Sequence, residues 1–243
     1  MTARTHRVFI ASPPLPDGTV VLAPDRSHYL VRVLRLRRGT TVLGVPGDGC
    51  AYALEIEDAS SVRCVLRNRG LAATEDAPEV RVHLAQSLIK GERLDWVVQK
   101  ATELGITDLW LVAAAHGEVR LDGRRLDNRL EHWRAVVASA CEQSGRLWLP
   151  EIHAPMALDE LVRNVAAQHR VLLDPGAPAL PALWRADTLL VVGPEGGWSD
   201  DERRVAQAAG LSVFGLGEIV LRADTAPVAA LAALRHGWGW RRP

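Results

Sequence analysis

Long hydrophobic runs are missing from this sequence of 243 residues. No apolar segment reaches the roughly 18 residues that indicate a membrane-spanning helix, and the first residues lack the apolar core of a signal peptide. The sequence therefore favours a protein that neither spans a membrane nor is secreted, and we expect it in the cytoplasm.

Cysteine is also scarce. The three cysteines, Cys50, Cys64 and Cys141, are odd in number, widely scattered and without the spacing of metal ligands. We expect reduced thiols, mostly buried, and no metal site.

An excess of charge of either sign is absent. Lys and Arg together number 29, as do Asp and Glu, so the formal net charge is 29 − 29 = 0. Contact with nucleic acid would therefore require a local basic patch. No Gly-x-Gly-x-x-Gly turn follows the first strand, which disfavours a dinucleotide-dependent enzyme. The composition, 48% hydrophobic and 24% charged, is typical of a globular protein.

Short strands dominate the first part of the chain. Short apolar runs at residues 19–22, 40–45, 51–56 and 62–66 are separated by segments that contain turn-forming residues such as glycine. This pattern is typical of a small β-barrel. Between the first two runs, helical spacing of apolar residues predicts a short helix within residues 27–38.

Five arginines and no acidic residue lie between residues 26 and 38. Guanidinium groups match phosphate oxygens with paired hydrogen bonds, so this segment is a candidate surface for RNA. A solvated helix face would give the same pattern. The arginines are Arg26, Arg32, Arg35, Arg37 and Arg38.

Residues 70–78 have no hydrophobic periodicity and end in proline, which predicts a linker between a domain of residues 1–72 and a second of residues 79–243. Beyond the linker, strands alternate with helices. That alternation indicates an α/β domain with a mostly parallel sheet covered on both faces.

Two glycine-containing turns in the last third of the chain each follow a buried strand and precede a helix. They lie within residues 189–202 and 213–227. Ser199 and Glu202 form a capping box, and Asp224 or Thr225 can cap the next helix. Because both turns would open at the same edge of the sheet, the sequence predicts a ligand site there. The strand end at residues 172–175 (Leu-Leu-Asp-Pro) is a third candidate for this site, although interpretation as an ordinary strand exit has at least equal support.

The turn Gly193–Gly197, the pair Leu216–Gly217 and the run from Leu221 to Ala226 resemble the paired signatures of the knotted SPOUT methyltransferases. The match extends to the 16S rRNA uracil-N3 methyltransferase family through Lys100–Gly105 and the Glu142-Gln143-x-x-Arg146 segment. The segment around His28 is similar to that family's PUA-like RNA-binding domain. The resemblance therefore covers nearly the whole chain.

The resemblance implies a PUA-like β-barrel domain followed by a SPOUT domain with a C-terminal trefoil knot, which physical reasoning alone would not propose. It implies S-adenosylmethionine as cofactor, a uridine N3 of 16S rRNA in the small ribosomal subunit as acceptor, and a homodimer. Trp238 and Trp240 could cover the dimer interface or pack within one chain.

The resemblance also assigns roles to residues. Arg222 is the catalytic candidate, because a guanidinium can stabilise a developing uridinate. The proton of N3 would pass to Glu142, Glu195 or water. Donor-binding candidates are Leu172, Leu173, Gly193, Pro194, Glu195, Gly196, Gly197, Leu216, Gly217, Val220, Leu221, Thr225 and Ala226. RNA-binding candidates are Arg26, His28, Arg32, Arg35, Lys90, Arg93, Lys100, Glu142, Gln143 and Arg146.

Two positions depart from the family pattern. Ile219 stands where the family has arginine, and Asp224 where it has glutamate. Two other functions remain open at this stage. One is methylation of a ribose 2′-hydroxyl in rRNA or tRNA, and the other is a non-catalytic RNA-binding factor in ribosome assembly.

Overall fold

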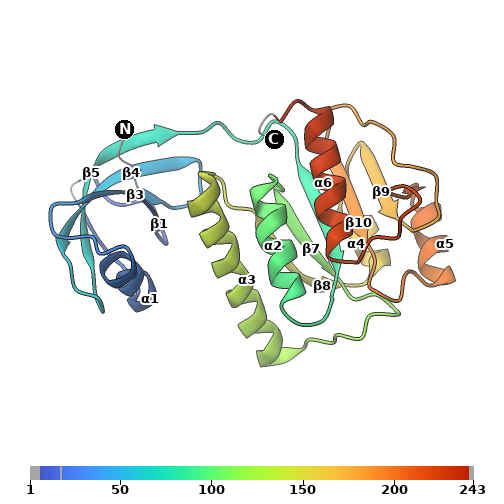
Figure 1. The fold of residues 1–243 in the computed structure, drawn as a ribbon, viewed down its shortest axis with the longest axis horizontal. Coiled ribbons are helices and arrows are strands. Elements are labelled where there is room, and N and C mark those ends of the chain that lie inside the picture. Colours follow the sequence, from blue (N-terminus) through green and yellow to red (C-terminus); the bar gives the residue numbers. More distant parts are fainter. Residues whose placement is uncertain (1–5, 17, 241–243) are drawn as a thin grey trace. The chain divides into compact units, whose positions relative to one another are not determined.

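The structure is a computed structural model that describes residues 6–16 and 18–240, and the chain divides into two compact units (Figure 1). Unit 1 comprises residues 1–77 and 141–149. Unit 2 comprises residues 78–140 and 150–243.

Unit 1 is built on a five-stranded sheet with the order β1-β3-β4-β5-β2. β1 runs parallel to β3, and the other neighbours are antiparallel. Leu30, Leu54 and Ile56 are fully buried in its core. The strands are β1 (Arg7–Phe9), β2 (Thr19–Val21), β3 (Thr41–Val45), β4 (Cys50–Asp58) and β5 (Val65–Thr74).

The expected helix of residues 27–38 is shorter and begins earlier. It consists of α1 (Pro24–His28) followed by one π-helical turn, η1 (Tyr29–Val33). Pro24 occupies the start of α1, where its missing N–H costs no hydrogen bond. Arg35 then adopts a positive φ of 56°, which ends the helical conformation before the rest of the basic segment.

The expected linker of residues 70–78 begins too early, although the division between the units after residue 77 lies within it. β5 continues to Thr74 because it pairs with β4 as far as Cys50 opposite Thr74. Composition predicted a loop there, but cross-strand hydrogen bonding satisfies this backbone as a strand.

The segment Cys141–Leu149 belongs to unit 1, although it follows most of a helix of unit 2. The Leu147 N–H donates to Glu75 at 3.0 Å, and the Trp148 indole donates to the Glu75 carbonyl at 3.0 Å. Leu147 also packs with Val45 and Ala51. A domain boundary drawn at one point in the sequence therefore misses this segment.

Unit 2 contains a six-stranded parallel sheet with the order β11-β9-β10-β6-β7-β8. All five residues of β10 are buried, as expected for a strand covered on both faces. The strands are β6 (Val82–Ser87), β7 (Asp108–Val112), β8 (Glu151–Met156), β9 (His169–Leu173), β10 (Thr188–Val192) and β11 (Ser212–Phe214).

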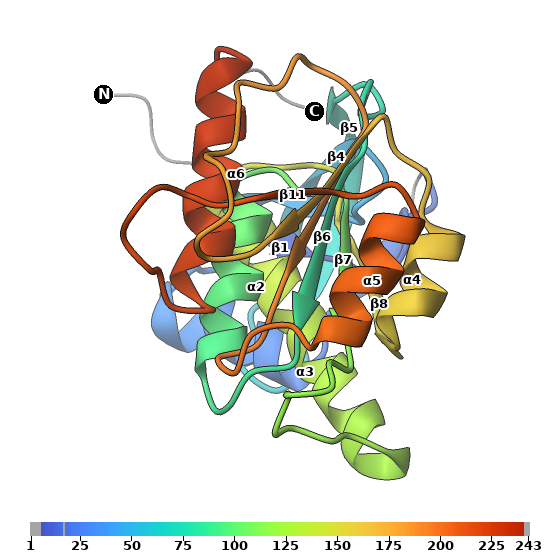
Figure 2. The same ribbon diagram turned by 90° about the vertical axis from the view of Figure 1, so that its right-hand side faces the viewer.

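Helices cover both faces of this sheet. Figure 2 shows α2 and α6 together on one face, with α4 and α5 together on the other. The fold class expected for this part of the chain, α/β with a parallel sheet, is confirmed. The helices are α2 (Arg93–Glu103), α3 (Gly123–Ser144), α4 (Leu158–Asn164), α5 (Asp200–Ala208) and α6 (Thr225–Gly237).

The predicted helix signals are present. Ser199 and Glu202 form the capping box of α5, and Gly105 has a positive φ of 89° just beyond α2. Asp224 precedes α6 as its N-cap residue, but its side chain makes no capping hydrogen bond.

The three cysteines are free thiols, with Cys64 and Cys141 buried. Burial raises the pKa of Cys141 to about 11, which keeps this thiol protonated and unreactive. Among the described residues, no helix combines the length and apolarity needed to span a membrane.

Candidate active site

A cavity of about 450 Å³ opens where β9, β10 and β11 end. This is the edge of the sheet where parallel α/β folds bind ligands, because the loops after neighbouring strands converge there. Three segments contribute to the lining: residues 173–176 at the end of β9, residues 192–195, 197 and 198 at the end of β10, and residues 215–223 after β11, with Ala226 at the start of α6.

The turn after β10 is fixed by its own backbone and by packing. The Gly197 N–H donates to the Pro194 carbonyl at 3.0 Å, and Gly197 has a φ of 71°, which favours glycine. A Cβ at Gly193 would lie 3.1 Å from the Trp198 ring. The Trp198 indole donates to the Leu173 carbonyl at 3.1 Å, so this buried ring joins the ends of β9 and β10.

The loop after β11 offers unused hydrogen-bond donors. Its first residue, Gly215, is held by hydrogen bonds to Pro178 and Leu180. In the described structure, no N–H group of residues 216–223 donates to another part of the chain. Gly217 has a φ of 104° and faces open space. These amides are therefore free to bind a ligand beside apolar side chains.

Most of the predicted donor-binding residues line this one cavity, but three do not. Leu172 is fully buried in the core of unit 2, because alternate residues of a strand face opposite sides. Gly196 faces His116, and a Cβ there would approach His116 to 2.9 Å. Thr225 is exposed at the first position of α6 and is absent from the lining.

Other residues of the lining were not among the donor-binding candidates. Trp198 follows the glycine turn directly, so its position in the sequence was the available signal. Gly215 lies within the predicted turn of residues 213–227, and a Cβ there would lie 2.7 Å from the Ala177 carbonyl oxygen, so a larger residue would not fit. The lining residues outside that candidate list are Asp174, Pro175, Gly176, Val192, Trp198, Gly215, Glu218, Ile219 and Ala223, of which Asp174 and Pro175 belong to the strand end that the sequence analysis also considered.

Arg222 lines the cavity with a side chain that is 64% exposed. Its Nε lies 3.7 Å from Oδ1 of Asp224, a buried oxygen without a hydrogen-bond partner in the described structure. The acidic residue at position 224 thus lies beside the predicted catalytic arginine even with its shorter side chain. Ile219 is 78% exposed and places an apolar group, not a cation, at the lining.

Two carboxylates that line the cavity, those of Asp174 and Glu195, interact with different arginines. Asp174 accepts a hydrogen bond from Arg203 Nε at 2.7 Å. Glu195 lies 3.2 Å from Arg93 and is 44% exposed. Arg93, predicted to contact RNA, therefore also joins the start of α2 to the glycine turn.

The other predicted RNA-binding residues of unit 2 are ion-paired. Lys90 pairs with Glu118, and Lys100 pairs with Glu103 within α2. Both pairs are at least partly exposed, so each contributes little to stability and can open for another anion.

In unit 1, Arg26 and Glu142 form a structural pair. Arg26 donates to both Glu142 oxygens at 3.0 Å, and the Phe9 N–H donates to Oε1 at 2.6 Å. Burial raises the pKa of Glu142, although Arg26 opposes that shift. Arg146 and the exposed residues Gln143, His28, Arg32 and Arg35 belong to the same unit.

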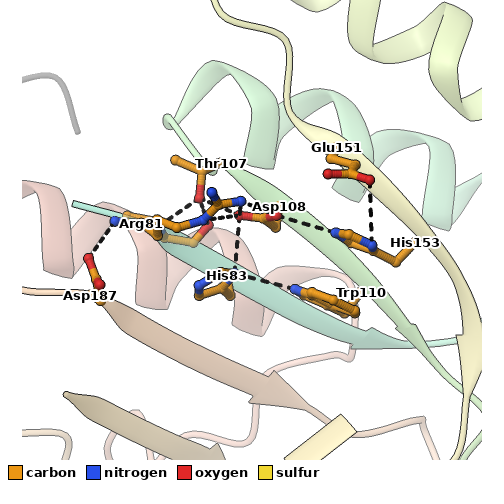
Figure 3. Close-up of polar contacts among 9 residues, drawn as sticks. Arg81, His83, Thr107, Asp108, Trp110, Glu151, His153 and Asp187 are labelled. Atoms are coloured by element: carbon orange, nitrogen blue, oxygen red, sulfur yellow. Dashed lines mark hydrogen bonds and ion pairs between the residues drawn. The ribbon is translucent and has the colours of Figure 1, made fainter. Parts of the chain in front are cut away.

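A second polar cluster lies at the opposite, amino-terminal edge of the parallel sheet (Figure 3). Its centre is Asp108, which is 1% exposed and accepts hydrogen bonds from Arg81 at 2.7 Å and Thr107 at 2.7 Å. His83 and His153 lie 3.1 and 3.3 Å from its oxygens. Burial alone would raise the pKa of Asp108, but the hydrogen bonds from His83, Arg81 and Thr107 hold it well below its ordinary value.

Asp108, Glu151 and His153 are close enough to share a metal ion, with ligand atoms within 4.8 Å of one another. The Arg81 guanidinium, however, already occupies both oxygens of Asp108. A cation would have to displace it. His153 is also stacked on Trp110, with ring centres 3.5 Å apart. This arrangement is a satisfied ion-pair network that joins the first residues of three strands.

Comparison with known proteins agrees with this geometry. Residues 76–235 match the model of the RNA methyltransferase domain family. The chain is 32% identical to ribosomal RNA small subunit methyltransferase E of Synechocystis sp. over 94% of its own length and 77% of the relative's. It is 34% identical to the Mycobacterium bovis protein of the same name over 90% and 88%.

Solved structures give the same result. A methyltransferase of Legionella pneumophila, in complex with the bound cofactor SAM, superposes with a TM-score of 0.89 at 29% identity and covers 96% of this chain and 98% of its own. Ribosomal RNA small subunit methyltransferase E of Neisseria gonorrhoeae, bound to S-adenosyl methionine, gives 0.84 at 29% identity, with coverages of 96% and 98%.

Fold, cavity and comparisons together define an RNA methyltransferase. The chain belongs to the ribosomal RNA small subunit methyltransferase E family, as the sequence resemblance predicted.

Proposed function

We propose that this protein transfers a methyl group from S-adenosylmethionine to N3 of a specific uridine in 16S rRNA of the small ribosomal subunit. The observation that supports this most directly is the cavity at the ends of β9, β10 and β11, with its unused backbone donors. The related structures with bound SAM support the choice of cofactor.

The lining fits the two chemical parts of such a donor. Leu216, Val220 and Leu221 provide apolar surface for an adenine ring, and the unpaired amides of residues 216–223 can bind its nitrogen atoms. Gly193 and Gly197 keep side chains away from the cavity wall at the end of β10. When bound, S-adenosylmethionine supplies an electrophilic methyl group on a sulfonium.

Alignment is the main contribution of the protein to such a displacement. Holding acceptor and donor in line can supply on the order of 7–11 kcal/mol of barrier reduction at best. The turns around Gly197 and Gly217, which shape two walls of the cavity, require glycine, because their φ values of 71° and 104° are unfavourable for other residues.

Methylation of the acceptor nitrogen has two further requirements. N3 lies on the pairing edge of uridine and carries a proton, so the base must be unpaired or flipped out, and the proton must leave. Arg222 stabilises the negative charge that develops on the uracil carbonyl oxygens. It remains protonated itself, so it is not the base. Glu195 lines the cavity and is our candidate proton acceptor, whereas Glu142 is already bound to Arg26 and the Phe9 N–H.

The test is to incubate purified protein with labelled S-adenosylmethionine and either 16S rRNA or assembled small subunits, then to identify the product by nucleoside mass spectrometry. We expect N3-methyluridine. A 2′-O-methylnucleoside would favour the ribose alternative. Absence of any product, together with no thermal stabilisation by S-adenosylmethionine, would favour a non-catalytic RNA-binding factor.

We propose that unit 1 is a PUA-like RNA-binding domain whose contact surface is the basic segment that ends in Arg38. Arg32, Arg35, Arg37 and Arg38 are exposed, which supports this role. An enzyme that acts on rRNA in this way would work in the cytoplasm.

We also propose a trefoil knot in the C-terminal segment. The chain after β11 is hydrogen-bonded to the loop between β9 and β10 through Gly215, and then continues to α6 on the other face of the sheet. Passage through that loop would produce the knot. Pulling on both termini of the unfolded chain in optical tweezers should then give an extended length shorter than that of an unknotted control.

The homodimer is likewise a proposal. Trp238 is 6% exposed and its indole donates to the Leu183 carbonyl at 3.0 Å, so it packs within its own chain. Trp240 is 60% exposed and remains a candidate for the interface. Analytical ultracentrifugation should show a dimer, and Trp240→Ala should weaken it.

A further inference from the structure

We call the cavity at the ends of β9, β10 and β11 the donor cavity. A second cavity, of about 530 Å³, also lies in unit 2 and is separate from it. Its walls are the loop after β6, the segment before α3 and one side of the first turns of α3. The lining consists of Leu88, Ile89, Gly91, Glu92, Leu94, Val119, Leu121, Arg125, Asn128, Arg129 and Trp133. The volume lies within the range of small-molecule sites.

One wall carries a guanidinium in a fixed position. The Arg129 Cζ lies 4.8 Å from the centre of the Trp133 ring, and Arg129 Nη2 donates to Asp95 at 3.3 Å. Asp95 also accepts the indole N–H of Trp133 at 2.8 Å. Trp133 itself is only 1% exposed, so Arg129 is the planar group that this wall offers to a ligand. Arginine planes are one of the surfaces on which unpaired RNA bases stack.

Two exposed polar side chains of the second cavity's lining have no partner in the described structure. Arg125 and Asn128 are exposed, and neither side chain makes a hydrogen bond or ion pair within the described structure. Arg125 can bind a phosphate, and Asn128 can both donate to and accept from the edge of a base. Glu92 is the single acidic residue of the lining, against two arginines.

The cavity is linked to the edge of the sheet that holds the donor cavity. β6 is the direct neighbour of β10, and the segments after the two strands are joined by the Arg93–Glu195 ion pair at 3.2 Å. The His116 ring nitrogen Nδ1, in the segment after β7, lies 3.3 Å from the Gly196 carbonyl oxygen. An RNA strand with one nucleotide in the donor cavity can therefore continue along this edge of the sheet to the second cavity.

We propose that this second cavity binds one unpaired nucleotide of the RNA substrate near the nucleotide that is methylated. The base lies between the apolar side chains and Arg129, and its phosphate binds Arg125. This inference rests on the proposed function, because it takes the donor cavity to be the place of methyl transfer.

The test compares Arg125→Ala and Asn128→Ala with Arg124→Ala, an equally exposed arginine of α3 outside the lining. We expect Arg125→Ala to raise the KM for 16S rRNA about 10-fold, since it removes a charge-assisted contact. The affinity for S-adenosylmethionine and the melting temperature should not change. A KM equal to that of Arg124→Ala would overturn the proposal.

Val119→Trp provides a second test, because it fills the cavity without changing any charge. It should weaken binding of 16S rRNA as Arg125→Ala does, whereas simple charge attraction would leave it at the wild-type affinity. Binding of 16S rRNA is measured separately from methylation. Arg125-dependent binding without a methylated product would contradict only the proposed function. Methylation that neither Arg125→Ala nor Val119→Trp impairs would contradict only this cavity's role.

Discussion

Glu195 makes an exposed ion pair with Arg93, whereas Asp174 is held by Arg203 and the Glu218 carboxylate makes no ion pair in the described structure. If Glu195 accepts the N3 proton, Glu195→Gln should lower kcat about 10²-fold, as the loss of a general base does. Binding of S-adenosylmethionine should be retained. Single-turnover methylation measures the effect, and Glu218→Gln serves as the comparison. A larger loss in the Glu218 variant would transfer the role to that residue.

Asp108 is the residue with the strongest buried network in unit 2. Its pKa is depressed in the folded protein, so its contribution to stability is present above the unfolded pKa of about 3.9 and is lost as the pH falls through the folded value. Asp108→Asn should reduce the free energy of unfolding by about 3 kcal/mol at neutral pH, because it leaves buried partners unsatisfied.

Urea denaturation across a pH series measures this difference. The gap between wild type and Asp108→Asn should narrow as the pH falls from about 3.9 towards the lower pKa of the folded state, since the unfolded chain then binds a proton that the folded carboxylate does not. Glu151→Gln is the control, because Glu151 is 70% exposed and lies 3.9 Å from His153. A gap that stays constant into acid would show that the charge of Asp108 is not what stabilises the fold.

Helices and strands could be predicted from the sequence where local signals were strong. The capping box at Ser199 fixed the start of α5, and the buried run before Gly193 fixed β10. Residues 70–74, expected within the linker of residues 70–78, are part of β5, because pairing with β4 is a contact across the sheet that composition does not encode. For the same reason the second cavity was missed: Arg125 and Leu88 belong to segments that only the fold brings together.

The cap of α5 gives a prediction at this scale. Ser199→Ala removes the hydroxyl that accepts the Glu202 N–H at 3.2 Å, and should cost about 1 kcal/mol of stability. Glu202→Ala should cost more, because Glu202 also accepts the Ala115 N–H at 2.8 Å. Thermal denaturation measures both. Ser212→Ala, at an exposed serine of β11, should be neutral, and equal effects at Ser199 and Ser212 would refute the cap's importance.

At the scale of the whole molecule, the even charge balance directs RNA binding to local patches. Arg32, Arg35, Arg37 and Arg38 are exposed on unit 1. Replacing Arg37 and Arg38 with glutamine should flatten the dependence of log K on log salt by about 0.7 to 0.9 for each lost phosphate contact. Filter binding of 16S rRNA over a salt series measures this slope.

Arg63→Gln is the matched control, because Arg63 is an exposed arginine of unit 1 outside the basic segment. Its slope should equal that of the wild type. If the double variant also keeps the wild-type slope, the basic segment does not contact phosphates, and the role proposed for unit 1 would need another surface.

Because residues 141–149 belong to unit 1, this unit is not encoded by one continuous stretch of the gene. A fragment that stops at residue 77 would uncover Val45 and Ala51 and leave the acceptors at Glu75 without their donors. The amino-terminal half cannot therefore be exchanged between proteins by a single genetic crossover. Recombination would have to carry over a short stretch from the middle of the gene as well, which ties the ancestry of unit 1 to that of the methyltransferase unit.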